Sequence, residues 1–194
     1  MKFVRLTFIV GSFALLFSCA ENAKQQTLLY PIDSLLNQQA LLLSEGNALL
    51  RKAAFLDGSE SISEYKPGSV DDWKKELEVF YNLGTINKPV NSNSYDVERH
   101  TDGDAGHVIK FKAKEELLIE EMIISYRDKP LFPASIEARV KEENSMYQGT
   151  QQLKMEFEAV DGKSVMRHYS ITGGQEMFLS DSVQYRIDAE ITYR

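Results

Sequence analysis

The sequence predicts an α+β fold, in which two N-terminal amphipathic helices pack on an antiparallel, strongly curved meander sheet of about seven strands. Apolar residues recur at helical spacing over residues 33–56 and 70–83. From about residue 94 to residue 194, apolar and polar residues alternate instead, which is typical of strands that bury one face. Short turn-like segments such as Asp161-Gly162 separate these stretches. A half-barrel or a small sandwich satisfies the pattern.

The first predicted helix spans residues 33–56 and begins at Asp33 or Ser34, since both side chains can cap a helix. Leucines recur along one side at every seventh residue, at Leu35, Leu42, Leu49 and Leu56. Asp57-Gly58 is the predicted C-terminal stop. The leucine stripe favours packing on the protein's own sheet, and the alternative is a coiled coil with a partner. The flanking positions are mostly Asn, Gln, Ala and Ser, whereas coiled coils usually carry charges there.

The second predicted helix covers residues 70–83 and follows a polar loop at residues 58–68. Ser69 and Asp72 resemble a capping box in which the aspartate replaces the usual glutamate. Gly84 is expected to end this helix. Its apolar face carries Trp73, Leu77, Phe80 and Tyr81.

The remaining residues predict strands. Alternation is strictest near the C-terminus, where one face carries Val183, Tyr185, Ile187, Ala189, Ile191 and Tyr193. The same alternation appears over residues 107–114, 132–141 and 147–159. Residues 117–127 and 164–172 read as strands by composition.

The N-terminus has the layout of an exported protein, with Lys2 and Arg5 before an apolar stretch that is too short to span a bilayer. Leu16-Phe17-Ser18-Cys19 resembles the lipobox of bacterial lipoproteins, although a residue smaller than Phe17 is commoner there. The resemblance implies a signal peptide at residues 1–18 and a diacylglycerol and further fatty acid at Cys19. A polar tether at residues 19–27 and a single globular domain at residues 28–194 follow from this division.

Composition narrows the classes of function. Cleavage before Cys19 removes Lys2 and Arg5, so the net charge changes from −7 to −9 (−7 minus 2). An acidic domain lacks the basic footprint of a nucleic-acid binder. Cys19 is the one cysteine, so no disulfide can form within the chain. We find none of the motifs that mark nucleophilic hydrolases, phosphate-binding loops or zinc proteases, and therefore expect a non-enzymatic protein without a cofactor.

Two groups of residues are candidates for a site. His100, Asp102, Asp104 and His107 could bind a metal if a hairpin brought the histidines together, and the alternative is an ordinary polar turn. Arg167 lies among apolar residues of a predicted strand, so it could face a ligand. The alternatives are that the solvent-exposed face of that strand is the one with Arg167, or that Arg167 lies at the rim of the sheet. Trp73 is a second possible ligand-facing residue, with a place in the core as the alternative.

We expect a membrane-anchored binding or assembly module of the bacterial envelope, contacting a protein partner at the periplasmic face of the outer membrane. Ala20 follows the cysteine, where an aspartate retains enteric lipoproteins at the inner membrane. The alternative is a carrier of lipid or another apolar ligand, by analogy with the lipoprotein-sorting carriers LolA and LolB. A metal-dependent enzyme built on the histidine cluster is the third hypothesis.

Overall fold

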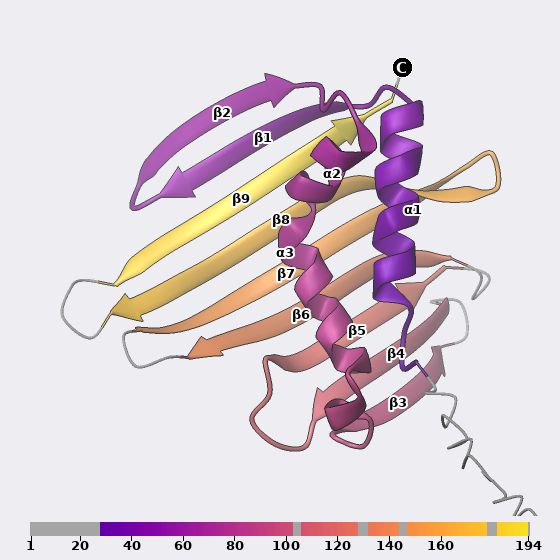
Figure 1. The fold of residues 1–194 in the computed structure, drawn as a ribbon, viewed down its shortest axis with the longest axis vertical. Helices are drawn as coiled ribbons and strands as arrows, with labels where there is room; N and C mark the ends of the chain where they lie inside the picture. Colours follow the sequence, from indigo (N-terminus) through magenta and orange to yellow (C-terminus); the bar gives the residue numbers. More distant parts are fainter. Residues whose placement is uncertain (1–27, 103–105, 128–131, 144–146, 178–181, 194) are drawn as a thin grey trace, which may run out of the picture.

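The computed structural model shows one open antiparallel sheet with helices on one face (Figure 1). It describes residues 28–102, 106–127, 132–143, 147–177 and 182–193. The helical elements are α1 (Ile32–Glu45), α2 (Val70–Glu76), α3 (Glu78–Tyr81) and the 3-10 helices η1 (Asn82–Asn87) and η2 (Pro89–Asn91). The strands are β1 (Leu49–Leu56), β2 (Ser59–Tyr65), β3 (Tyr95–Asp102), β4 (Gly106–Ala113), β5 (Ile119–Tyr126), β6 (Pro133–Glu143), β7 (Tyr147–Val160), β8 (Lys163–Met177) and β9 (Val183–Thr192).

The predicted fold class is wrong in three respects: the number of strands, the helices and the shape of the sheet. The described residues contain nine strands rather than seven, in the order β2-β1-β9-β8-β7-β6-β5-β4-β3. The described strands form a single sheet with two free edges, β2 and β3, so the sheet is not closed and no second sheet packs on it as in a sandwich. Strands β3 to β9 follow one another as antiparallel neighbours, and β1 then pairs with β9.

The predicted helix over residues 33–56 is a helix in its first part only. α1 starts at Ile32 and ends at Glu45, and the Gly46 N–H donates to the Leu42 carbonyl at the end of the helix. Asn47 adopts a left-handed conformation with a φ of 49°, which turns the chain into β1. The last two leucines of the repeat belong to β1, where Leu49 is half-buried and Leu56 is exposed, so they do not continue the face of a helix. The seven-residue spacing of the leucines therefore extends from α1 into β1 by coincidence.

Asp57-Gly58 is a hairpin turn rather than the end of a helix. Both residues have positive φ, 45° and 83°, which a tight two-residue turn between antiparallel strands requires. The turn leads into β2, which lies in the segment predicted as a polar loop. Every residue of β2 is exposed, because it is an edge strand that the helices do not cover. Without a buried face, β2 has no apolar alternation to identify it.

The predicted helix over residues 70–83 is divided into shorter pieces. Its start is confirmed: the Ser69 hydroxyl accepts the Asp72 N–H at 3.2 Å and donates to the Asp72 carboxylate at 2.8 Å. Gly84 does not end the helix but lies inside η1, where a Cβ would come within 2.5 Å of the Asp33 carboxylate. The helical run stops at Lys88, which is extended because Pro89 follows it.

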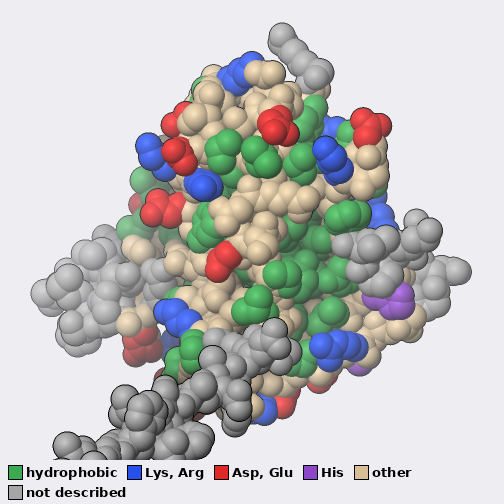
Figure 2. Space-filling view, turned by 45° about the vertical axis from the view of Figure 1, so that its right-hand side comes forward, with side chains coloured by type: hydrophobic (Ala, Val, Ile, Leu, Met, Phe, Trp, Pro, Cys, Tyr) green, Lys and Arg blue, Asp and Glu red, His purple; other side chains and the backbone are tan. Residues whose placement is uncertain are grey.

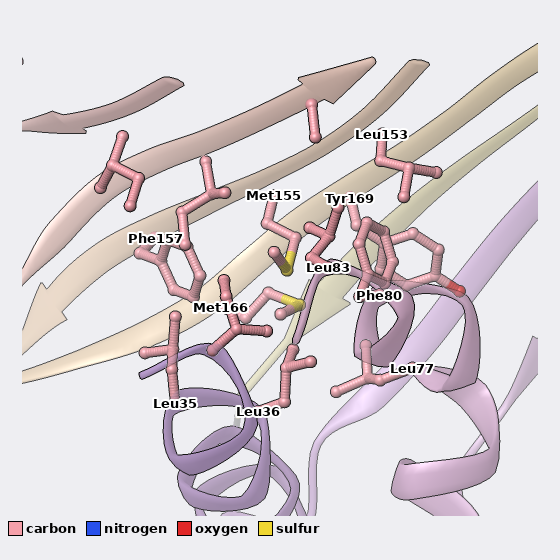
Figure 3. Packing of buried hydrophobic residues seen from close by; sticks show 14 of the residues in the cluster. Leu35, Leu36, Leu77, Phe80, Leu83, Leu153, Met155, Phe157, Met166 and Tyr169 are labelled. Atoms are coloured by element: carbon pink, nitrogen blue, oxygen red, sulfur yellow. The ribbon is translucent and has the colours of Figure 1, made fainter. Parts of the chain in front are cut away.

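The core lies between the helices and the covered face of the sheet (Figure 3). Leu36 of α1 and Leu77 and Phe80 of the α2–α3 segment point toward Met155 of β7 and Tyr169 of β8. The Phe80 and Tyr169 rings meet edge to face, with centroids 5.5 Å apart. These five side chains are 0–1% exposed, so the space between helices and sheet is filled.

A β-bulge in β8 is stabilised by a buried glutamine of α1. Glu156 pairs with His168 and Phe157 with Met166, so Arg167 is an extra residue that no β7 residue opposes. Gln39 lies fully buried beneath this irregularity. Its Nε2 donates to the Ser164 carbonyl and its Oε1 accepts the Met166 N–H, both at 2.8 Å. The helix side chain thus supplies hydrogen bonds to the strand backbone at the bulge.

Candidate functional site: the open face of the sheet

The face of the sheet opposite the helices is mostly polar, with a few apolar side chains such as Phe55 and Ile123. In an antiparallel sheet, opposed residues share a face, so the register identifies the side chains that lie together. Reading across from β4 to β9, the open face carries Lys112, Glu121, Arg139, Gln152, Thr172 and Arg186 in one row. The helix-covered face carries core residues in the neighbouring rows, as the alternation of the strands requires.

Ion pairs connect neighbouring strands on this open face. Lys110 Nζ of β4 lies 2.6 Å from the Glu121 carboxylate of β5. Lys154 Nζ of β7 lies 3.5 Å from the Glu137 carboxylate of β6 and 2.8 Å from that of Glu156 on its own strand. Hydrogen bonding to Glu156 raises the pKa of Lys154, and the same contact lowers the pKa of Glu156. His168 Nε2 lies 3.1 Å from an Asp188 carboxylate oxygen. The alternation of sign leaves no large area of a single charge among these residues.

The open face contains a shallow hollow whose lining is mostly uncharged. We call this the polar hollow; it is lined by Gln148, Thr150, Gln152, Thr172, Gly174 and Gln184, with Lys141 and Glu176 at its margin. Its volume is about 490 Å³. Gly174 lies directly under Gln184, because a Cβ there would be 2.4 Å from Gln184 Nε2. A second depression adjoins the hollow and shares Gln152 and Thr172 with it.

Amides and hydroxyls on adjacent strands offer both donors and acceptors at a surface that water reaches. Such a surface can bind a polar partner by hydrogen bonds. The described lining has no arrangement of nucleophile, base and oxyanion donors that would point to catalysis.

The hairpin of β3 and β4 does not bring the two predicted metal-binding histidines together. His100 opposes Val108 and His107 opposes Thr101, so the two imidazoles lie on opposite faces of the sheet. His100 Nε2 lies 3.4 Å from Glu98, and His107 Nδ1 lies 3.1 Å from the Thr101 hydroxyl. Within the described residues, no group of three potential ligands is close enough to hold a metal ion.

The two carboxylates of that predicted site cannot be placed. Asp104 and the side chain of Asp102 lie outside the described residues. The metal hypothesis therefore stays a prediction, but His100 and His107 cannot both bind the metal from one face of the sheet.

Arg167 and Trp73 both have contacts within the protein. The Arg167 Nε lies 2.8 Å from the Glu158 carboxylate, and its guanidinium lies 4.3 Å from the centre of the Tyr193 ring. Because Arg167 is the extra residue of the bulge, simple alternation does not apply to it. Trp73 is fully buried, and its indole N–H has no hydrogen-bond partner among the described residues. A ligand-facing role for either residue stays a prediction.

A polar network between α2 and the sheet is not predicted by any pattern in the sequence. The Glu76 carboxylate accepts hydrogen bonds from Tyr65 and Tyr169 and forms an ion pair with Lys52. Burial raises the pKa of Glu76, but the hydrogen bonds from Lys52, Tyr169 and Tyr65 outweigh it and hold that pKa below its ordinary value. The four residues come from β1, β2, α2 and β8, so no spacing in the sequence links them. The network attaches the helical layer to the sheet.

The predicted lipidation site, Cys19, lies outside the described residues. Among the residues that are described, no helix combines the length and the apolar character needed to cross a bilayer. Comparison of the chain with protein-family models, with curated proteins and with solved structures finds no match.

Proposed function

We propose that this protein is a lipid-anchored, non-enzymatic binding module of the bacterial envelope, which contacts a protein partner through the open face of its sheet. The observation that carries the proposal is the one-sided cover of the sheet, in which α1, α2 and α3 all lie on one face (Figure 1). The register of the strands and their exposure place polar side chains such as Thr150, Gln152 and Thr172 on the other face. Rigid strands hold those side chains in fixed register, which suits recognition of a folded partner.

The packing of the core favours a binding module over a carrier of apolar ligands. A carrier needs an apolar cavity, for which the space between helices and sheet is the natural place. Leu36, Phe80 and Tyr169 occupy that space and are almost inaccessible. The polar hollow lies on the opposite face and has a lining that suits hydrogen bonding rather than lipid chains.

Anchoring is tested by Cys19→Ser in a bacterial host supplied with a labelled fatty acid. We expect the native chain to incorporate the label and to sediment with membranes, and the serine variant to do neither. Equal labelling of both chains, or no labelling of the native one, contradicts the lipid anchor. We expect the anchored protein to fractionate with the outer membrane and to face the periplasm.

Partner binding is tested by a photo-activated cross-linking residue at Thr172, in the polar hollow, with Gln38 on α1 as the matched control. Both side chains are exposed, so neither substitution disturbs the core. We expect one discrete adduct from position 172 and none from position 38. Adducts of the same size and yield from both positions, or none from position 172 and one from position 38, place the contact elsewhere.

A further inference from the structure

The described chain begins beside η1 and η2, at one end of the molecule. The backbone N–H groups of Leu29 and Tyr30 donate to the Asn87 amide oxygen at 2.9 and 3.2 Å. The Asn87 Nδ2 donates in return to the Tyr30 carbonyl at 2.6 Å. These three bonds hold Leu29 and Tyr30, near the start of the described chain, against η1.

Large hydrophobic side chains are exposed around this point. Leu28 is 55% exposed, Val90 81% and Phe132 43%, which makes Val90 the most exposed of the large hydrophobic residues described. Val90 lies three residues after Asn87. Phe132 directly precedes Pro133, which pairs with Tyr126, and the Tyr126 side chain hydrogen-bonds Tyr30. Figure 2, which brings this side forward, shows hydrophobic side chains interspersed with basic and acidic ones.

Two exposed cations accompany these hydrophobic residues. Lys88 lies two residues before Val90, and Arg127 follows Tyr126 at the end of β5. Exposed apolar side chains flanked by lysine and arginine are the usual make-up of surfaces that lie on lipid headgroups. We call Leu28, Lys88, Val90, Arg127 and Phe132 the tether-side rim.

The length of the predicted tether sets how far this rim can be from a bilayer. Eight residues, 20–27, separate Cys19 from Leu28. At full extension of about 3.5 Å per residue they span about 30 Å at most, which is comparable to the diameter of a small domain. With Cys19 lipidated, the tether is therefore short enough for the rim to reach the bilayer surface.

We propose that the tether-side rim docks on the lipid bilayer, with Val90 and Phe132 at the depth of the headgroups and Lys88 and Arg127 beside lipid phosphates. The inference rests on the lipid anchor of the proposed function. Docking would orient the domain, because a tether alone leaves the open face free to point in any direction. An oriented domain presents that face to a partner at a fixed height above the membrane.

The experiment uses the full lipidated protein in vesicles of phosphatidylethanolamine and phosphatidylglycerol. Because Cys19 is the one cysteine and its sulfur is consumed by the lipid, Val90→Cys introduces a unique thiol for an environment-sensitive dye. Ile62→Cys is the matched control, since Ile62 is also a hydrophobic residue, 56% exposed, but lies in the edge strand β2. Both positions are on the surface, so labelling leaves the fold intact.

We expect a blue shift at position 90 and loss of most of its emission when spin-labelled lipids are added, while position 62 keeps the emission of a dye in water. If the protein floats with vesicles and the two positions give the same emission and quenching, docking is overturned and the anchor stands. If the protein does not float and its Cys19 thiol still reacts with the dye, the lipid anchor fails and the docking inference fails with it.

Discussion

Replacing Gln39 with leucine should destabilise the fold by about 3 kcal/mol, although the two side chains are similar in size. The substitution removes the hydrogen bonds to the Ser164 carbonyl and the Met166 N–H. Both backbone groups lie at the bulge beneath α1, where Gln39 is fully buried and water has no access. Each unsatisfied buried group costs about 1–3 kcal/mol, and the apolar side chain regains a part of the total.

The matched control for this change is Gln38→Leu, on the exposed side of the same helix turn. Urea unfolding of the purified protein, followed by circular dichroism, gives both free energies of unfolding. We expect the control to stay within about 0.5 kcal/mol of the native protein. An equally small effect for Gln39→Leu would refute the role given to the glutamine, and hydrogen exchange at Met166 should then remain slow.

Three further predictions concern stability, and the first two use the same urea unfolding assay. Glu76→Gln should cost about 2 kcal/mol at pH 7, whereas the exposed Glu78→Gln should be neutral. The pKa of Glu76 is held low in the folded state, so the stability that its ionised form contributes is present above pH of about 4.3 and is lost as the pH falls further. The free energies of unfolding of the native protein and of Glu76→Gln should therefore converge in acid. Gly106→Ala should lower the free energy of unfolding by about 3 kcal/mol, because a Cβ there would lie 1.9 Å from the Tyr126 carbonyl oxygen. Gly162→Ala is the control, since Gly162 has a similar positive φ but open space around it, and it should cost about 1 kcal/mol. Equal losses from the two substitutions would contradict the role of the contact with Tyr126. A chelator should leave the melting temperature unchanged, and a clear drop would support the metal hypothesis.

The strands that bury one face could be predicted from the sequence. The alternation over residues 183–193 corresponds to β9, in which Ala189 and Ile191 are buried and Glu190 is exposed. The same reasoning fails for β2, since an edge strand exposed on both sides has no pattern to read. It also fails at Arg167, because the bulge shifts the alternation by one residue.

The candidate site was harder to predict than the strands. The strands predicted from alternation each have a polar face, but the sequence does not show whether helices cover one side of the sheet or both. The placement of α1, α2 and α3 on a single face is a tertiary property, and it converts the polar faces of separate strands into one continuous surface. The register of the β3–β4 hairpin is likewise not visible in the sequence, and a shift of one residue in it decides whether His100 and His107 share a face.

The corrected course of the chain after Glu45 also bears on where a partner can bind. As one long helix, residues 33–56 offered a leucine seam for a coiled coil, with sustained heptads as its main support. Leu49 and Leu56 belong to β1 instead, so the repeat is reduced to the turns of α1. There, Leu35 and Leu36 are buried against the sheet and cannot face a second helix. The course of the chain thus removes the main support for the coiled-coil alternative, and the open face, whose side chains the register of β6, β7 and β8 holds side by side, remains the surface that we propose for a partner.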